Sequence, residues 1–482
     1  MDVFLLHAGQ PGVRRLLDRV GVANGRRPPG ARDGRTLYVL RWLEGSGAAE
    51  EEEGGTPSWN GVRVLQPASA VRLASDRKAR EAALKRNGVN LFRPVQGSSG
   101  IRRQFVVPVF QLESLGVFSQ GGPLGAIKRL HSASDPELSE WNGGQTSRSL
   151  SGSRAEREAI KAVYSLGLDY GIVTIVSDET GAAAVADVNP YPPSEEEFVD
   201  RFAAAIGRLQ EGLARERQQS APILLGTDPE FVLRRKGADG KIVMASHFLE
   251  RKGSAGCDSI RIGDRLIYPL AELRPAPAAE PSELFRNLYA AMKLAAEKID
   301  DATIEWLAGG MPSGGLALGG HIHVSGLWLH SDLLRAMDNY VALPLVLLED
   351  VTTKRRRPRY GALGDFRRQF HGGFEYRTLP SWIVTPVLAM GVLALARTVC
   401  DHYRELGQRP LERADLQEAY YRGDRELLKE AALRLWRELE RTNGYARYGK
   451  YLNKLKRKLE NGERWNEQSD VRLAWKLPPY RV

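Results

Sequence analysis

Four pairs of polar residues between positions 223 and 380 constrain the fold of this chain more than any other feature. In each pair the two residues stand two positions apart within a strand-like stretch. The pairs are Asp228 and Glu230 in LLGTDPEFVL, Glu272 and Arg274 in LIYPLAELRP, His321 and His323 in LGGHIHVSG, and Glu375 and Arg377 in GFEYRTL. Side chains at positions i and i+2 of a strand project to the same face of a sheet. The wet face of an ordinary antiparallel sheet explains one such pair, whereas four pairs favour a functional site.

The residue types in these pairs indicate chemistry with a divalent cation and a phosphate. Several carboxylates with one or two imidazoles suit Mg²⁺ or Mn²⁺, which prefer oxygen ligands. The neighbouring Arg274 and Arg377 are not metal ligands, but guanidinium groups clamp phosphoryl oxygens and neutralise their charge. A zinc hydrolase would need the helical HExxH spacing, which is absent. Zinc binding by the His-x-His pair alone stays open.

Two further segments in this region favour a ligand that carries phosphate. The approach to the histidines, LAGGMPSGGLALGGHIHVSG, contains seven glycines in twenty residues, and glycine permits close approach of the backbone to a ligand. A merely flexible connector is the alternative. The run KRRRPRYGALGDFRR at 354–368 adds guanidinium groups that could cover nucleotide phosphates, and Arg367 is the one we favour.

These motifs resemble a known family. DPEF, Glu272, GGHIHVS and FEYR follow the order of the glutamine synthetase-like catalytic domain, and the region of about 220–400 is most similar to the phage-type COOH–NH2 ligases, or amidoligases. The resemblance implies an antiparallel catalytic sheet with helices, with ATP and Mg²⁺ (or Mn²⁺) as cofactors. It implies that His323 contacts nucleotide phosphate and that Arg377 and Arg367 stabilise phosphoryl charge. The residues implied to hold the metal are Asp228, Glu230, Glu272, His321 and Glu375.

The chain departs from glutamine synthetase itself in two respects. It has no equivalent of the longer run of second-strand glutamates and none of the ammonia-site loop. We therefore expect an amine larger than ammonia as the nitrogen donor.

The N-terminal half carries a second, weaker likeness. The segment GLDYG…VADVNPYP at 167–192 resembles the end of an ATP-grasp domain, in which Asp187 and Asn189 would bind metal and nucleotide, with Asp169 upstream. The segment LFRPVQGSSG at 91–100 resembles the Lys-Pro strand and glycine loop of that domain, but Arg93 replaces the lysine. This half would then bind nucleotide weakly or act as a degenerate, substrate-holding domain. A strand that ends in an Asn-Pro turn is the alternative interpretation of DVNPYP.

The fold class that follows is α+β. We expect an α/β ATP-grasp-like domain at 1–215, a ligase domain at 220–405 with one antiparallel catalytic sheet, and a basic helical extension at 406–482. A polar run, RERQQSAP, marks the linker between the first two. Thr385 is a good N-cap and Pro386 suits the first helical position, so 386–404 should be a buried helix.

The composition excludes several classes of protein. Cys257 and Cys400 are the two cysteines, too few for a disulfide framework. The chain starts without a signal-peptide pattern, and its longest apolar stretch is too short to span a membrane. We therefore expect a soluble, cytoplasmic protein. Of the net charge of +10, a surplus of seven lies in 441–482, where 11 Lys and Arg face 4 Asp and Glu. A solvated helical face explains this surplus better than recognition of nucleic acid.

The function predicted from these observations is an ATP-dependent, ADP-forming carboxylate–amine ligase. An amino acid, a peptide or a cell-wall or protein group would supply the carboxylate, which ATP converts to an acyl phosphate. Two alternatives stay open: a phosphotransferase on the same fold, and a catalytically inactive protein that binds nucleic acid or another polyanion. A homo-oligomer is compatible with the sequence.

Overall fold

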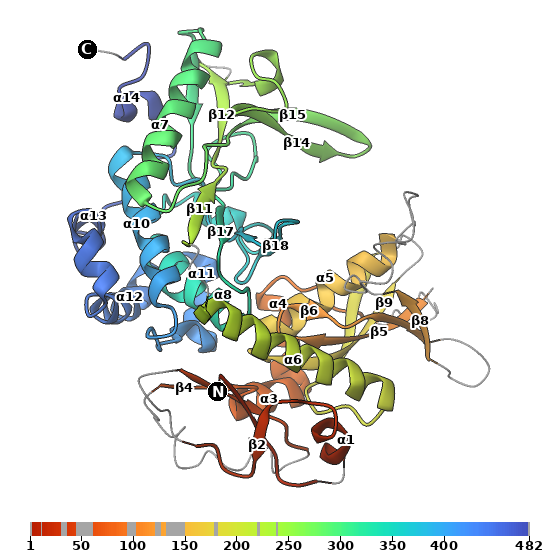
Figure 1. The fold of residues 1–482 in the computed structure, drawn as a ribbon. Coiled ribbons are helices and arrows are strands. Elements are labelled where there is room, and N and C mark those ends of the chain that lie inside the picture. Colours follow the sequence, from red (N-terminus) through yellow and green to blue (C-terminus); the bar gives the residue numbers. More distant parts are fainter. Residues whose placement is uncertain are drawn as a thin grey trace. The chain divides into compact units, whose positions relative to one another are not determined.

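The computed structural model describes residues 2–10, 12–29, 36–44, 61–93, 103–120, 127–131, 150–177, 182–218, 222–237 and 240–480. The chain divides into two compact units, Met1–Gln219 and Ser220–Val482 (Figure 1). Each unit has its own sheets, and each is described by itself below.

The first unit begins with a small parallel sheet in the order β2-β1-β3-β4. Its strands are β1 (Val3–Leu6), β2 (Ala23–Gly25), β3 (Leu37–Arg41) and β4 (Val62–Leu65). The helices in this part of the unit are α1 (Val13–Leu17), α3 (Ala68–Ser75) and α4 (Arg77–Arg86). The Asp76 side chain caps helix α4, because it accepts a hydrogen bond from the Ala79 amide at 2.9 Å.

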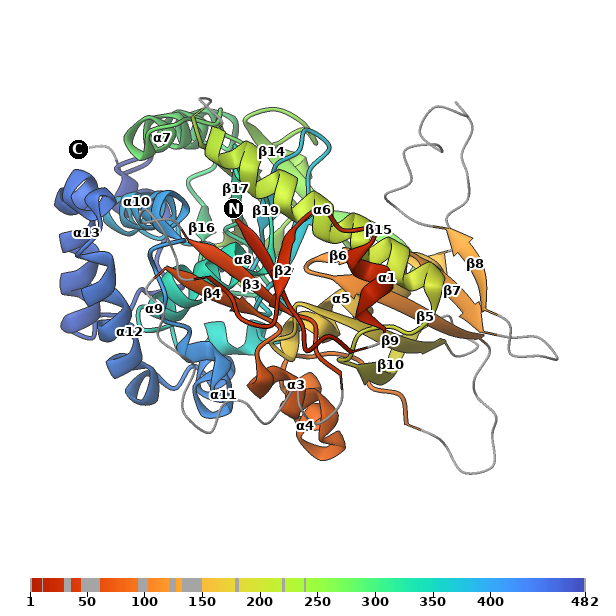
Figure 2. The same ribbon diagram turned by 60° about the horizontal axis from the view of Figure 1, so that its bottom comes forward.

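A second, antiparallel sheet completes this unit in the order β10-β9-β5-β7-β8, with β6 beside β5. Its strands are β5 (Arg103–Phe110), β6 (Glu113–Ser114), β7 (Val117–Gln120), β8 (Ile127–His131), β9 (Tyr170–Ser177) and β10 (Ala183–Asn189). Helix α5 (Leu150–Ser165) packs Val163 into the core with Val107 and Ile175. Helix α6 (Glu196–Gln218) packs Phe198 and Phe202 against Phe118 and Phe110. Figure 2 shows the ribbon of α6 beside the strands of this sheet. Since successive strand residues alternate between faces, Val107 and Phe110 lie on opposite faces, so the two helices cover both sides of the sheet.

The second unit contains two antiparallel sheets, where the sequence predicted one. One sheet has the order β11-β17-β19-β18, and the other has the order β13-β12-β15-β14 with β16 beside β12. The strands of the first are β11 (Leu224–Thr227), β17 (Ile322–Ser325), β18 (Phe366–Arg368) and β19 (Phe374–Tyr376). Those of the second are β12 (Glu230–Arg235), β13 (Ile242–Val243), β14 (Ala255–Ile262), β15 (Arg265–Leu273) and β16 (Ile304–Leu307).

The one-sheet prediction failed at Asp228 and Pro229, which lie between β11 and β12 and outside both ladders. Proline has no amide hydrogen to donate to a neighbouring strand, so the chain can leave one sheet here and enter the other. Hydrogen bonds between Glu230 and Gly319, the residue two before His321, connect the two sheets again.

Helices pack around these sheets. They are α7 (Pro281–Lys298), α8 (Ser331–Met337), a π-turn (Asp338–Ala342), α9 (Leu343–Val346), α10 (Pro386–His402), α11 (Ala414–Arg422), α12 (Arg425–Leu439), α13 (Asn443–Glu460) and α14 (Val471–Trp475), with short 3-10 turns η2 (Ala245–His247), η4 (Thr353–Arg356) and η5 (Pro410–Glu412). None of the described helices is both long enough and apolar enough to cross a membrane.

The buried helix predicted at 386–404 is confirmed as α10. The Thr385 hydroxyl accepts a hydrogen bond from the Leu388 amide at 3.2 Å, and every residue from Leu388 to Cys400 is buried. Helix α13 packs against α10, where a Cβ on Gly391 would lie 3.1 Å from Leu455. Residues 406–482 therefore belong to the second unit and complete its core.

Candidate active site

The register of the sheet β11-β17-β19-β18 in the second unit places a row of polar residues on one face. His323 on β17 is paired with Glu375 on β19, which is paired in turn with Arg367 on β18. Directly paired residues of adjacent strands project to the same face. On the other side of His323 the paired residue is Gly226, which has no side chain. The row of polar side chains thus ends at His323.

Asp228 approaches this row from the connection between the two sheets. Its Oδ1 lies 3.0 Å from Nδ1 of His321, and its Oδ2 lies 3.2 Å from Nε2 of His323. Burial would raise the pKa of the Asp228 carboxyl, but the two imidazoles outweigh it and hold the pKa well below its usual range. Burial likewise favours a neutral His321, yet Asp228 and Glu230 raise its pKa above the ordinary value. Asp228 is therefore a carboxylate across the physiological pH range.

Glu375 is the most enclosed of the site carboxylates, with a side chain only 2% exposed. Its Oε1 lies 3.2 Å from Nδ1 of His321 and 2.9 Å from Nε of Arg377. Its Oε2 lies 3.2 Å from Nη1 of Arg367 and accepts a hydrogen bond from Nε2 of Gln369 at 3.1 Å. Sequence reasoning missed Gln369, although its position two residues after Arg367 on one hairpin was a signal for it.

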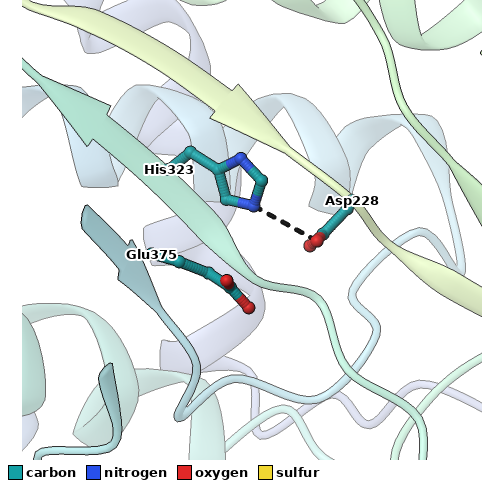
Figure 3. Close-up of side chains that lie close together, drawn as sticks. All are labelled: Asp228, His323 and Glu375. Carbon is teal, nitrogen blue, oxygen red and sulfur yellow. Dashed lines mark ion pairs between the residues drawn. The ribbon is translucent and has the colours of Figure 1, made fainter. Parts of the chain in front are cut away.

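Asp228, His323 and Glu375 form the group best suited to hold a cation. One potential ligand atom from each lies within 4.8 Å of the others, and the three side chains point toward one another (Figure 3). The buried Nε2 of His323 is close enough to Asp228 for an ion pair but makes no well-directed hydrogen bond among the described residues. Two carboxylates and an available imidazole nitrogen fit Mg²⁺ or Mn²⁺.

The two histidines are placed differently with respect to this cation group. The sequence assigned His321 to the metal and His323 to nucleotide phosphate, whereas the cation group contains His323. His321 lies between two carboxylates through a single nitrogen, Nδ1. That contact places the His321 ring between Asp228 and Glu375.

Glu230 and Glu272 form a separate carboxylate pair on the second sheet, outside this group. They are directly paired on β12 and β15. Glu230 accepts a hydrogen bond from the Gly319 amide at 2.6 Å, and burial raises its pKa to about 7. Glu272 forms an ion pair with Arg274. A Cβ on Gly256, the residue paired with Glu272, would meet the Arg274 guanidinium, so a side chain there would displace Arg274 from its present position.

Two arginines of the basic run at 354–368 are held by contacts within the fold. Arg356 is buried and donates to the carbonyl oxygen of Thr378 at 2.8 Å, and Arg357 is ion-paired with Glu349 at 2.8 Å. Both guanidinium groups therefore hold the fold together. Arg367, the residue favoured from sequence, is the one that reaches the carboxylate row, and its side chain is 57% exposed.

The candidate residues of the N-terminal half lie in surroundings different from those of the carboxylate row. Asp187 on β10 is 58% exposed and pairs with Arg80 at 2.7 Å. Asn189 accepts a hydrogen bond from the Tyr191 amide at 3.0 Å, as in a simple turn. Asp169 is fully buried and accepts from the Gln66 amide at 2.5 Å. The glycine loop predicted at 96–100 lies outside the described residues.

Asp187 and Arg93 nevertheless line one cavity of about 340 Å³ beside helix α4. Its cationic lining residues are Arg77, Lys78, Arg80, Lys85 and Arg93, and its apolar ones include Leu84, Leu91 and Phe92. Glu81 and Asp187 are the acidic residues in the lining, so positive charge dominates.

Comparison with known proteins bears on both units. Residues 225–477 match the family described as phage phiEco32-like COOH.NH2 ligase-type 2. No curated protein matches the chain. Similar solved structures include the ATP-grasp ligase PsnB, complexed with minimal precursor, Mg and ADP, at 11% identity and a TM-score of 0.27, covering 42% of this chain and 96% of that one.

Two other structures are similar at the same level. A bifunctional glutathione synthetase from Pasteurella multocida has 11% identity and a TM-score of 0.34, covering 56% of this chain and 52% of that one. A D-alanine–D-alanine ligase from Bacillus anthracis has 9% identity and a TM-score of 0.27, covering 45% of this chain and 99% of that one. TM-scores this low do not establish a common fold.

Proposed function

Because the chain belongs to the phage phiEco32-like COOH.NH2 ligase-type 2 family, we propose that it uses ATP to activate a carboxylate as an acyl phosphate and then couples it to an amine. A carboxylate oxygen of the substrate attacks the γ-phosphorus, and the bond to the bridging oxygen breaks to release ADP. The amine nitrogen then attacks the carbonyl carbon, phosphate leaves, and the nitrogen loses a proton. The amino acid, peptide, cell-wall or protein group that carries the carboxylate is left to experiment.

The observation that carries this proposal is the convergence of three ligands and two guanidinium groups on one point of the family-matched region. Asp228, His323 and Glu375 would hold Mg²⁺ or Mn²⁺. Such a cation supplies charge neutralisation for the transferring phosphoryl group. Arg377 and Arg367 already lie against Glu375, so they stand beside the site where that charge would develop.

Each charged residue of the site then has a role in binding the cation or the phosphoryl group. Asp228, ionised through its two imidazole contacts, keeps one strong ligand in place at neutral pH. Arg367 is exposed enough to turn from Glu375 toward a phosphoryl oxygen, whereas the less exposed Arg377 stays with Glu375. A guanidinium group can form two parallel hydrogen bonds with either a carboxylate or a phosphoryl group. On the second sheet, Arg274 is held by Glu272 and is a further candidate for contact with phosphate.

The basic cavity of the first unit suits an anion, which agrees with the interpretation of that unit as a weak nucleotide-binding or substrate-holding domain. Phe92 and Leu84 offer an apolar surface, and Arg77, Lys85 and Arg93 offer positive charge. Arginine in place of lysine keeps the charge of Arg93 but changes its shape and hydrogen-bond geometry. We therefore assign the phosphoryl transfer to the second unit.

The test is ADP formation by the purified chain with Mg²⁺ or Mn²⁺, screened over amino acids and peptides as carboxylate and amine donors. We expect ADP release that depends on both donors, together with an amide product of matching mass. ADP release without an added amine would indicate a phosphotransferase instead. Absence of ADP with every donor pair, together with salt-dependent binding to polyanions, would reject an enzymatic function.

A further inference from the structure

Glu467 is a fully buried carboxylate in the C-terminal segment, far from the motifs in sequence. Five donors surround it. Oε1 accepts from the Gly310 amide at 2.5 Å, from Nε1 of Trp465 at 3.2 Å and from the Thr353 hydroxyl. Oε2 accepts from the Met311 amide at 3.0 Å and from the Thr352 hydroxyl at 2.9 Å. A buried carboxylate is tolerated only when its oxygens are satisfied in this way.

The first segment held by Glu467 leads to the histidines. The carbonyl oxygen of Gly310 accepts a hydrogen bond from the Leu318 amide at 2.9 Å, which closes the glycine-rich loop at its base. The next residue, Gly319, donates its amide to Glu230 and accepts from the Glu230 amide. His321 follows two residues later. The position of the His321 ring therefore depends on where Glu467 holds Gly310.

The second segment held by Glu467 leads to Arg377. Thr353 begins the turn η4, whose last residue, Arg356, donates to the carbonyl oxygen of Thr378. Thr378 directly follows Arg377. The two segments also touch each other, because a Cβ on Gly310 would lie 2.5 Å from Cγ2 of Thr353. Gly309, at φ +118°, has no room for a side chain beside Glu467.

We propose that Glu467 is a positioning residue of the ligase site. Its carboxylate fixes the glycine-rich loop and the η4 turn relative to one another, and through them it sets the places of His321 and Arg377. This inference rests on the proposed function and assigns a role to the basic C-terminal region, which the sequence left without one. Errors of about 1 Å in such placements cost roughly a hundredfold in rate.

The test compares Glu467→Gln with a matched control in the same segment, Asp470→Asn. Asp470 is also a buried carboxylate, but its partner is Arg472 at 2.8 Å, which donates to the carbonyl oxygen of Ile304 on β16. Neither contact reaches the glycine-rich loop or η4. Both substitutions keep size and shape, and both remove one buried charge from the same stretch of chain.

We expect Glu467→Gln to lower kcat about tenfold or more with little change in KM for ATP. It should also weaken Mn²⁺ binding, measured by calorimetry without nucleotide, by about tenfold. Asp470→Asn should change both quantities by less than about twofold, measured well below the melting temperatures of both variants. Thr353→Val, which removes one donor and keeps the shape, should reproduce a smaller version of the Glu467→Gln effect.

Four outcomes would overturn one proposal or both. If Glu467→Gln and Asp470→Asn lower the melting temperature and leave kcat and Mn²⁺ affinity equally unchanged, Glu467 is structural only. Should Glu467→Gln fail to fold, wild-type kcat and Mn²⁺ affinity in Thr353→Val would reject the inference. If the wild-type chain binds Mn²⁺ but forms no ADP, the proposed function is rejected, and the comparison of Mn²⁺ affinities still tests the role of Glu467. If the wild-type chain neither binds Mn²⁺ nor forms ADP, both proposals are rejected.

Discussion

The edge strand β10 of the first unit and the strand pair β17–β19 of the second carry similar polar spacing in very different surroundings. Asp187 on β10 is more than half exposed and has one cationic partner, Arg80. Glu375 on β19 is almost completely enclosed, forms ion pairs with His321, Arg367 and Arg377, and accepts a hydrogen bond from Gln369. Charge–charge interactions are weak in water and strong where water is excluded. A spacing of two residues therefore indicates a site only when the fold buries it among partners.

The largest effect is expected at Glu375. Glu375→Ala should lower ADP formation roughly a thousandfold, because it removes a cation ligand and frees the guanidinium groups beside it. We expect a loss of about 3 kcal/mol in stability as well, since two arginines and His321 lose their counter-charge. Repulsion between clustered carboxylates would by itself leave such a variant stable, but the cationic partners of Glu375 outweigh that repulsion.

Steady-state ADP formation and urea unfolding measure both parts of this prediction. Glu305→Ala, which removes the partner of Arg234 on a neighbouring strand, is the control for stability alone. A Glu375→Ala variant that keeps half of wild-type turnover would remove Glu375 from the site.

His321→Ala and Asp187→Ala compare the two units directly. His321→Ala should cost roughly a hundredfold or more in ADP formation, because Asp228 and Glu375 lose the imidazole that holds both. Asp187→Ala should cost less than about tenfold, because its exposed ion pair contributes little. The two variants are assayed at saturating Mg²⁺. If Asp187→Ala is the more damaging change, the first unit carries the phosphoryl transfer.

A smaller effect, and one that depends on pH, is expected at Glu230. Burial raises its folded-state pKa from 4.5 to about 7, so the folded protein binds a proton there that the unfolded chain releases. The stability from this group is complete below about pH 4.5 and is lost as the pH rises through 7, by up to about 3 kcal/mol. Glu230→Gln abolishes that titration.

Unfolding curves of wild type and Glu230→Gln from pH 5 to pH 8, in the presence of a chelator, measure the difference in their free energies of unfolding. The variant should gain stability relative to wild type as the pH rises. A constant difference across this range would contradict a raised pKa for Glu230.

The smallest effects are expected at two helix N-caps, one in each unit. Thr385→Ala removes the cap of α10, and Asp76→Ala removes the cap of α4 beside the basic cavity. Each should cost about 1 kcal/mol. Hydrogen exchange should show the loss in the unit that carries the substitution. If either variant lowers the protection from hydrogen exchange equally in both units, the two units unfold together.

Local sequence was informative wherever short-range chemistry decides the structure. The cap at Thr385 was predicted because a side-chain oxygen satisfies amides within the first turn of its own helix. The burial of α10 was predicted from a run that is apolar on all sides. Sequence alone could not predict Gly256 or Glu467 as parts of the site, because each acts through a residue that only long-range pairing brings near.

The sequence by itself determined which residue types were available: carboxylates, imidazoles and guanidinium groups at a spacing that points each pair to one side of a strand. Tertiary structure decided how they are grouped. The break at Pro229 divides the predicted sheet in two, so Asp228 joins His323 and Glu375 while Glu230 joins Glu272. The physical reason is that spacing along a strand sets only the direction of a side chain. Register between strands, and the burial that follows from packing, set its neighbours and its charge.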